Sequence, residues 1–478
     1  MRILVFSLGV VFQSKVLGGS QKVLRDIAVG LGRKGHSVTI LCPYREDNCE
    51  SFVLGENAVV KPILPLRGAF PLPYGVSPFA LTEVCRIVGE EILHADLFYC
   101  HDGGLNIEFL KNRIPTVISL RDFCYAETLL GALNFNEEHI IVNSMHTYLC
   151  LHDSFRQVNP RISGKVSIVY NGYCGETFKP SEISQEFYDF TGLPKKTDMV
   201  VVGFPHRPDS TKGFVNALKV IRILKQRWGE RIKLLIPQYM DKGLSDRTDE
   251  TYNVIQRNIE VMGLENNILT YEWIPHDKMP EYYSYCDLIL CIGSFVEAFS
   301  NVSVESLLCG TPVIAANTST YRTMPIKEYI HIVPYGDIEQ TSREAEAILT
   351  QGSDCKLCGA RDYILSNLTI DNMVDEFERV FGEAMASFRL RLDENSIGIT
   401  SSGWTDTSAT SQCVKLAAWC EYLDEKFFDD YTHRYYDDMF HGIVRDHCSV
   451  FTMEELQQKG ITPDVVENAL RQGILVRV

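Results

Sequence analysis

Residues 294–316 read SFVEAFSNVSVESLLCGTPVIAA, and this stretch decides how we interpret the whole chain. An apolar run at residues 287–291 predicts a short strand before it, and the apolar pattern of residues 302–308 predicts a helix capped by Ser300 or Asn301. The first N–H groups of a helix have no partner inside it, and the helix dipole favours an anion at that end. A strand, a small-residue turn and a helix therefore predict a phosphate-binding site here.

Two glutamates flank this predicted anion site, and seven residues separate them. The phosphate would be held by the backbone N–H groups of three residues: Asn301, Val302 and Ser303. Glu297 precedes them and Glu305 lies one helical turn beyond. The two carboxylates would then bracket a nucleotide diphosphate sugar, with Glu297 toward the sugar and Glu305 toward the ribose hydroxyls.

The composition is that of a globular protein with ample apolar residues for its cores. The chain has 478 residues, 45% of them hydrophobic, and 62 acidic against 46 basic side chains give a net charge of −16. This charge argues against nonspecific nucleic-acid binding and against docking on anionic membranes. No apolar run has the length of a membrane-spanning helix, and the first twelve residues lack the features of a signal peptide. We therefore expect a cytoplasmic protein without an integral membrane segment.

Most of the 15 cysteines lie inside apolar strand or helix patterns. Reduced cysteine behaves there as a small buried hydrophobe, so we expect free thiols. Cys355 and Cys358 have the spacing of half a zinc site, but neither a second such pair nor paired histidines lie close in sequence. We predict no metal site.

Strand-like and helix-like segments alternate twice along the chain. The first series has strands at residues 2–6, 37–42, 97–101, 116–120, 139–143 and 165–170, with a helix at 20–33. After a polar stretch, the second series has strands at residues 199–203, 232–236, 268–273, 287–291, 312–316 and 329–333, with a helix at 212–228. Continuous apolar strands alternating with helices predict an α/β protein with two doubly wound parallel sheets. We place the two domains at residues 1–185 and 186–370.

A different composition begins after the second domain. Residues 395–412 are rich in serine, threonine and glycine and predict a linker. Beyond it we predict a small, mainly α module at residues 413–478, with helices at 414–428 and 453–458, a third after Thr462, and a terminal strand. Its helix-turn-helix-strand ending suggests a winged helix, but the acidic sequence disfavours DNA binding. We expect it to pack on the chain or to dock a protein partner or a second copy.

Five segments, in order, resemble one known family. They are residues 17–41 (a glycine loop and first helix), 169–180 (an Asn-Gly junction), 201–214 (a strand and Lys-Gly pair), the E-x7-E stretch, and 309–319 (CGTPVIAANTS). Together they resemble the retaining GT-B glycosyltransferases with an E-x7-E motif, the large family that includes sucrose synthases, bacterial glycogen synthases and mannosyltransferases.

The resemblance implies two Rossmann-like domains that face a cleft. The second would bind a nucleotide-sugar donor and the first a saccharide, lipid-linked or small-molecule acceptor, with a helix at 371–390 crossing back onto the first. The implied activity is retaining sugar transfer in polysaccharide or glycoconjugate biosynthesis, with no metal or other cofactor.

The resemblance also implies roles for residues of the second domain. Glu297 would contact donor-sugar hydroxyls, Glu305 the ribose, and the backbone around Pro275 the base. Lys212 would stabilise the leaving diphosphate. Arg207 would assist it from a longer loop, because Phe204 stands where the family usually has its arginine; a solvated loop charge is the alternative for Arg207.

On the first domain, Gly18 and Gly19 would let the backbone approach a phosphate or sugar, although a simple tight turn is the alternative. Relatives commonly carry His-Asp after the strand at 116–120, where this chain has Arg121 and Asp122. We predict a catalytic role for Asp122. Arg121 leaves the hexose undetermined and would suit a carboxylate or phosphate. His101 and Asp102 form another such pair, and either pair has a structural role as its alternative.

Two rival functions keep the same fold. One is a GT-B nucleotide-sugar epimerase or phosphorylase, which the five segments disfavour. The other is a degenerate GT-B scaffold that binds a partner, suggested by Arg121, Phe204 and the additional C-terminal module.

Overall fold

The computed structural model describes most of the chain. The described residues are 1–16, 18–66, 76–103, 113–133, 139–155, 159, 162, 165–206, 211–238, 248–271, 274–351, 355–394, 413–423, 425–430 and 434–477. Arg207 and the predicted linker at 395–412 lie outside them.

The first domain contains a sheet whose order in its described part is β3-β4-β2-β1-β5-β6-β7-β8. The strands are β1 Arg2–Ser7, β2 Ser37–Pro43, β3 Phe52–Gly55, β4 Ala58–Leu64, β5 Leu97–His101, β6 Thr116–Leu120, β7 His139–Val142 and β8 Val166–Ile168. Every neighbouring pair is parallel except β3 and β4. The chain reverses its direction of winding between β1 and β5, and such a switch point opens a crevice at the carboxyl ends of the strands.

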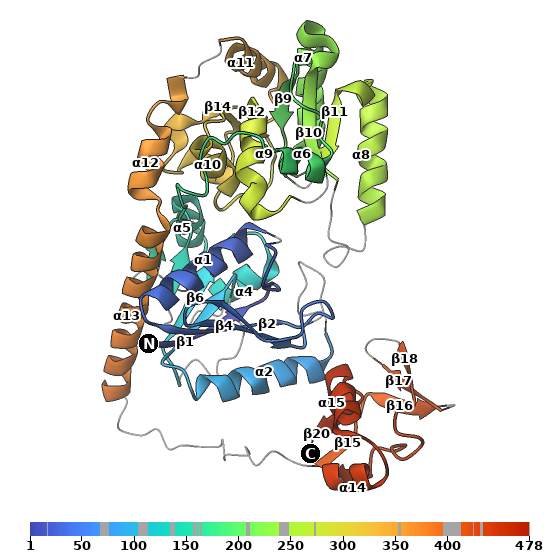
Figure 1. Ribbon diagram of the computed structural model, residues 1–478. Coiled ribbons are helices and arrows are strands. Elements are labelled where there is room, and N and C mark those ends of the chain that lie inside the picture. The colour runs from blue at the N-terminus through green and yellow to red at the C-terminus, as the bar shows by residue number, and fades with distance from the viewer. Residues whose placement is uncertain are drawn as a thin grey trace.

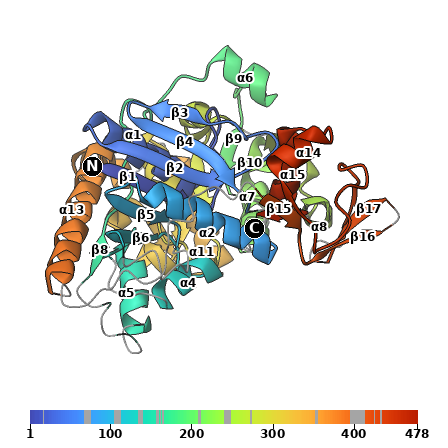
Figure 2. The same cartoon turned by 90° about the horizontal axis from the view of Figure 1, so that it is seen from below.

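Helices cover both faces of this sheet (Figures 1 and 2). They are α1 Gly19–Arg33, α2 Pro78–Ile92, α4 Ala126–Leu133 and α5 Met145–Asp153. Alternate residues of β1 point to opposite faces: Ile3 packs in the core that contains α1, and Leu4 packs in the core that contains α2. Strands β3 and β4 and helix α2 were not predicted from the sequence.

The second domain repeats this architecture with the sheet order β11-β10-β9-β12-β13-β14, all parallel. Its strands are β9 Val200–Gly203, β10 Ile232–Pro237, β11 Ile268–Tyr271, β12 Leu288–Cys291, β13 Val313–Ala316 and β14 His331–Val333. Its switch point lies between β9 and β12. The prediction of two doubly wound α/β domains is confirmed, whereas the boundaries at 185 and 370 stay predictions.

The helices of the second half are α6 Gln185–Thr191, α7 Phe214–Trp228, α8 Thr248–Met262, α9 Met279–Tyr285, α10 Asn301–Leu308, α11 Ile338–Gln351, α12 Ala360–Asn367 and α13 Ile370–Glu394. Short 3-10 helices are η3 Gly229–Arg231, η4 Glu265–Asn267, η5 His276–Lys278, η6 Ser319–Arg322, η7 Lys327–Tyr329 and η8 Cys355–Leu357. Helix α13 returns to the first domain, where Val374, Phe377 and Phe381 join the core on the α1 side of the sheet (Figure 1). Among the described residues, no helix has both the length and the hydropathy needed to span a membrane.

The C-terminal module is a mixed α/β unit, so the prediction of a mainly α module is wrong. Its elements are β15 Cys413–Leu416, β16 Cys420–Leu423, β17 Lys426–Asp429, β18 Arg434–Asp437, β19 Val450–Thr452, α14 Met453–Gln458, α15 Pro463–Gln472 and β20 Leu475–Arg477. Residues predicted as a helix at 414–428 form three strands. Val414 and Leu416 are both buried beside a half-buried Lys415, which is the period of a strand, and Glu425 with φ 61° forms the turn between β16 and β17.

The two helices and the final strand predicted at the end of this module are present. Thr452 and Glu455 form a capping box at the start of α14. Pro463 occupies the first turn of α15, and Gly473 ends that helix with φ 74°. Strands β19, β15 and β20 form one sheet, as a winged helix would have, and β16 to β18 form another.

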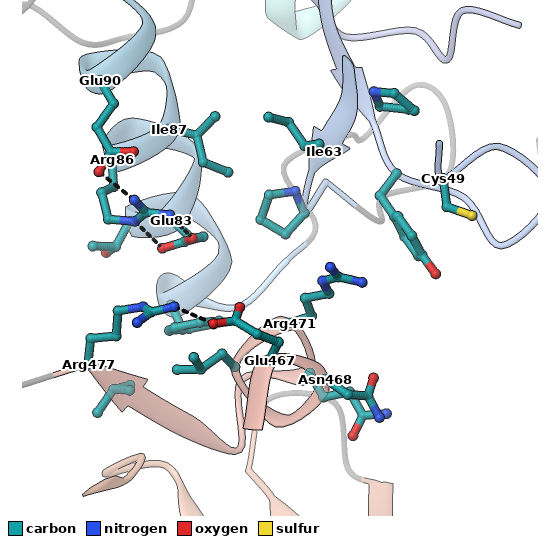
Figure 3. A pocket seen from close by; sticks show the side chains of 18 of the residues that line it. Cys49, Ile63, Glu83, Arg86, Ile87, Glu90, Glu467, Asn468, Arg471 and Arg477 are labelled. Atoms are coloured by element: carbon teal, nitrogen blue, oxygen red, sulfur yellow. Dashed lines mark hydrogen bonds and ion pairs between the residues drawn. The ribbon is translucent and has the colours of Figure 1, made fainter. Parts of the chain in front are cut away.

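The module lies against α2, on the side of the first domain away from the second domain (Figure 1). The rings of Phe79 and Trp419 lie 5.9 Å apart, and Trp419 Nε1 donates to the Gly473 carbonyl at 3.0 Å. A cavity of about 600 Å³ opens between α2, the strand β4 and helix α15 (Figure 3). Several charges on its walls are paired with one another, including Arg477 with Glu467 at 2.6 Å.

Candidate active site

Helix α10 begins as its sequence predicts, with Ser300 as its cap. Ser300 Oγ accepts a hydrogen bond from the backbone N–H of Ser303 at 3.3 Å. This bond uses the Ser303 amide, and Ser303 is fully buried, so it is not placed to hold a ligand phosphate. Asn301 and Val302, in contrast, line an open cavity. The N-terminus of α10 therefore faces this cavity through two of the three predicted residues.

The cavity has a volume of about 340 Å³ and lies between the two domains. Its walls come from residues that follow β5, β6, β7, β9 and β12 and from the N-termini of α1 and α10. The lining residues are Gly19, Ser20, Asp102, Arg121, Asp122, Tyr125, Asn143, Asn171, His206, Lys212, Phe295, Glu297, Ala298, Phe299, Ser300, Asn301 and Val302. The carboxyl ends of both sheets thus meet at one site, as the topology requires.

Lys212 and Glu297 meet at the second-domain wall of this cavity. Lys212 Nζ donates to Glu297 Oε1 at 2.5 Å and lies 3.7 Å from the centre of the Phe295 ring. The following Gly213 has φ 89°, and a Cβ there would lie 2.7 Å from the Ile292 carbonyl oxygen. Only glycine allows this close approach, which brings the chain before α7 against the segment after β12. The predicted lysine and glutamate are therefore held together by the fold.

Glu305 lies behind the cavity wall, with 6% of its surface exposed, and is not among its lining residues. Tyr283 donates its hydroxyl hydrogen bond to Glu305 Oε2 at 2.8 Å, and Lys22 Nζ lies 3.8 Å from Oε1. Burial raises the pKa of Glu305, while Lys22 lowers it. Lys22 also lies 4.4 Å from the centre of the Tyr173 ring. In this structure the partner of Glu305 is thus a first-domain lysine.

Asn301 connects the two domains at the floor of the cavity. Its Oδ1 accepts hydrogen bonds from Asn171 Nδ2 at 2.8 Å and from the Tyr173 hydroxyl at 2.6 Å. Gly19 lies directly opposite, because a Cβ on it would come within 2.4 Å of Asn301 Nδ2. The N-termini of α1 and α10 therefore approach each other at the same point.

Asp122 lines the cavity but has several partners of its own. Its carboxylate accepts hydrogen bonds from the backbone N–H groups of Cys124 at 3.0 Å and Tyr125 at 3.1 Å, and from Thr128 Oγ1 at 3.0 Å. Burial raises its pKa, and these donors lower it. The contacts are those of a residue that shapes the turn before α4.

Asp102 also lines the cavity, next to Ser20, whereas His101 is buried behind them. Tyr99 and His101 Nδ1 share a hydrogen bond at 2.8 Å, and His101 Nε2 lies 2.9 Å from Ser20 Oγ, which also contacts the Asp102 carboxylate. Burial raises the pKa of Asp102 and lowers that of His101. Asp102 has φ 64°, a left-handed conformation that strains the backbone where β5 meets the cavity.

Pro275 lies at the start of η5, and its carbonyl accepts from the Lys278 N–H at 2.9 Å. The neighbouring His276 packs edge-on against Phe178, with ring centres 5.4 Å apart. Burial lowers the pKa of His276 to about 4, with a further effect from the positive charges of Lys22 and Arg25. This segment belongs to the Glu305 side of the domain interface.

Several residues of the site were not predicted from the sequence. They are Ser20, Lys22, Asn143, Tyr173 and Phe295. The sequence gives one sign that Lys22 forms an ion pair: Asp26 lies four residues further along the helix, and the two side chains pair at 3.6 Å. A lysine in a helix is ordinarily a surface residue, so that signal does not reveal its burial.

The two facing sheets and the cavity at their carboxyl ends define a protein of the GT-B class. Residues 187–363 match the family described as "Glycosyl transferases group 1". This part of the chain is therefore similar to the group 1 glycosyl transferases.

Solved structures share the fold. A sucrose-phosphate synthase from Thermosynechococcus elongatus is 15% identical, with a TM-score of 0.65 over 81% of this chain and 100% of that one. Anabaena Alr3699/HepE in complex with UDP and glucose is 18% identical, with a TM-score of 0.60 over 80% of this chain and 100% of that one.

Among curated proteins, an uncharacterized 41.2 kDa protein in the cps region of Klebsiella pneumoniae is 25% identical over 198 residues, which are 41% of this chain and 47% of that protein. The alignments cover 47%, 55% and 25% of the lengths of three curated relatives, so the chain spans about half of their length or less.

Proposed function

We propose that this protein transfers a sugar from a nucleotide-sugar donor to an acceptor in the cavity between its domains. One observation carries the proposal: the N-terminus of α10 opens into that cavity beside Lys212 and Glu297. A helix N-terminus and a lysine, both positive, thus line the same cavity. They are suited to a leaving diphosphate, whose negative charge grows as the bond to the sugar breaks.

In this proposal the bond between the sugar C1 and the diphosphate oxygen breaks, and that oxygen takes the electron pair. The acceptor hydroxyl oxygen forms the new bond to C1, and its proton passes to the departing phosphate. Lys212, released from Glu297, would hold the diphosphate, and Glu297 would accept hydrogen bonds from the sugar. The resemblance of residues 294–316 to the E-x7-E motif supports retention of the anomeric configuration, and the cationic groups named above support transfer without a metal.

The experiment is a donor screen with the full-length protein. UDP, GDP, ADP and dTDP sugars are incubated with it, and release of the nucleoside diphosphate is measured with and without simple sugars as acceptors. Thermal shifts are recorded in parallel, since a ligand at 100 times its dissociation constant adds roughly 2.7 kcal/mol of stability.

We expect at least one donor to be cleaved, and NMR of the product to show the anomeric configuration of the donor. If no donor is cleaved and none raises the melting temperature, the protein is the scaffold rather than the enzyme. A product of inverted configuration would overturn retention alone.

A further inference from the structure

Arg121 is a buried cation at the first-domain side of the cavity. It follows β6, has 7% of its surface exposed, and lines the cavity. Its backbone is fixed by Asn143, whose Nδ2 donates to the Arg121 carbonyl at 3.1 Å. Its Nη2 donates to Asn171 Oδ1, a neutral acceptor. Its Nη1 is buried and has no hydrogen-bond partner among the described residues.

The carboxylates that line the same cavity already have partners. Glu297 pairs with Lys212, and Asp122 accepts three hydrogen bonds at the start of α4. Asp102 is engaged by Ser20. The positive charge of Arg121 lowers the pKa of Asp102, but burial raises that pKa by more, so the net shift is upward. Within the described part of the chain, none of these carboxylates forms an ion pair with Arg121, and a buried guanidinium donor without an acceptor is costly.

The N-terminus of α1 adds positive potential at the same place. This helix begins at Gly19, which lines the cavity, and its cap residue Gly18 has no side chain to accept from the first-turn N–H groups. A helix of 15 residues carries a substantial dipole, and its positive end faces the floor of the cavity. Arg121 and this helix end thus favour an anion on the first domain, apart from Lys212 on the second.

We propose that Arg121 and the N-terminus of α1 form a subsite for an anionic group on a sugar substrate, a carboxylate or a phosphate monoester. A guanidinium binds both groups through charge-assisted, bidentate hydrogen bonds, which lysine cannot reproduce. The inference rests on the proposed glycosyl transfer and makes it more specific: one of the two sugars is acidic. The anionic group is on the donor, as in a uronate, or on the acceptor, as in a sugar phosphate.

The test compares substrates that differ only in this charge. In the donor arm, full-length protein receives UDP-glucuronate against UDP-glucose, and GDP-mannuronate against GDP-mannose. In the acceptor arm, it receives glucose 6-phosphate against glucose with the donor that it cleaves fastest. We expect one arm to show at least a tenfold preference in kcat/KM for the charged member.

Arg121→Met should reduce that preference to about one, because the rate with the charged member falls more than the rate with the neutral member. Arg121→Lys should restore only part of the preference, because it keeps the charge without the two parallel donors. Arg33→Met, at an exposed position of α1, is the matched control and should keep the wild-type preference. Melting temperatures of all variants identify any that fail to fold. If Arg121→Met fails to fold, Arg121→Lys becomes the deciding variant.

Cleavage of neutral donors without preference in either arm would overturn the anionic subsite and leave the proposed function intact. Equal losses with charged and neutral substrates in Arg121→Met would also overturn it, since Arg121 would then only support Asn171. If wild-type protein cleaves no donor at all, the proposed function fails and the subsite fails with it.

Discussion

Lys22 Nζ lies 3.8 Å from Glu305 Oε1, and this ion pair joins the first helix of one domain to helix α10 of the other. Both side chains are buried, with 6% of each residue exposed. The pair holds the domains together at the place where the resemblance puts the donor ribose. Binding of a donor there would have to share or replace the contact of Glu305 with Lys22.

Glu305→Gln should destabilise the protein by roughly 2 kcal/mol, because buried Lys22 then keeps Asp26, at 3.6 Å, but loses the charge of Glu305. Lys22→Met in the same chain should recover at least about 1 kcal/mol of that loss, as expected for residues in contact. Urea unfolding of the two single variants and the double variant measures this coupling. If the two effects simply add, the ion pair does not contribute to stability.

Glu305→Ala should raise the donor KM more than it lowers kcat, because contacts with the ribose persist from the ground state to the transition state. Steady-state kinetics with varied donor concentration measure the two constants. An unchanged donor KM would remove Glu305 from the donor site and leave it as a purely structural partner of Lys22.

Lys212→Ala should lower kcat/KM by at least about tenfold, roughly 1.4 kcal/mol, since the lysine would balance the charge of the leaving diphosphate. Lys219→Ala is the matched control, because Lys219 is an exposed lysine of α7, the helix that follows Lys212. Nucleoside diphosphate release measures both variants. Equal activity of the two variants would show that Lys212 does not act on the diphosphate.

The stability of the protein should fall as the pH drops from about 6.5 to about 4 through His276, whose pKa is lowered from 6.5 to about 4. In this window the unfolded chain binds a proton that the folded chain does not, which costs roughly 3 kcal/mol of stability. His276→Gln should lose less stability than the wild type between pH 7.5 and pH 4.5 in urea unfolding. Exposed His94→Gln is the control, and identical losses in all three proteins would contradict the expectation.

EDTA should leave sugar transfer unchanged, because Lys212 and the N-terminus of α10 supply the positive charge that a metal would otherwise supply. Nucleoside diphosphate release is compared before and after dialysis against the chelator. A loss of activity that added Mg²⁺ or Mn²⁺ restores would show that the transfer depends on a metal.

Truncation after Ser396 should preserve donor hydrolysis and change the oligomeric state or the use of acceptors. The module lies against α2 (Figure 1), and none of its described residues lines the cavity between the two domains. Light scattering and acceptor kinetics measure the two properties. Insolubility of the shortened chain would show that the module is part of the first domain's core; unchanged assembly and kinetics would rule out a docking role. Phe79→Ala, which removes the ring against Trp419, should loosen the module in the full chain.

The sequence predicted most strands and helices of both domains because their signals are local. Apolar runs marked β5 and β6 to the residue, and Ser300 was one of the two residues predicted to cap α10. The Lys-Gly pair before α7 likewise follows from a backbone conformation that only glycine adopts easily. Local signals misled once, at residues 414–428, where apolar residues fit a helical period but the turn at Glu425 made strands instead.

The sequence by itself predicted the α/β fold class, the resemblance to GT-B glycosyltransferases and the segment that we propose as the phosphate site. The tertiary structure decided which side chains meet. It placed Lys22 beside Glu305, used the Ser303 amide for the helix cap, and left Arg121 Nη1 buried with no hydrogen-bond partner among the described residues. Periodicity and caps depend on neighbours in the chain, so they can be predicted from the sequence. Burial and pairing depend on how the two sheets and their helices pack against one another, and no spacing along the chain encodes that contact.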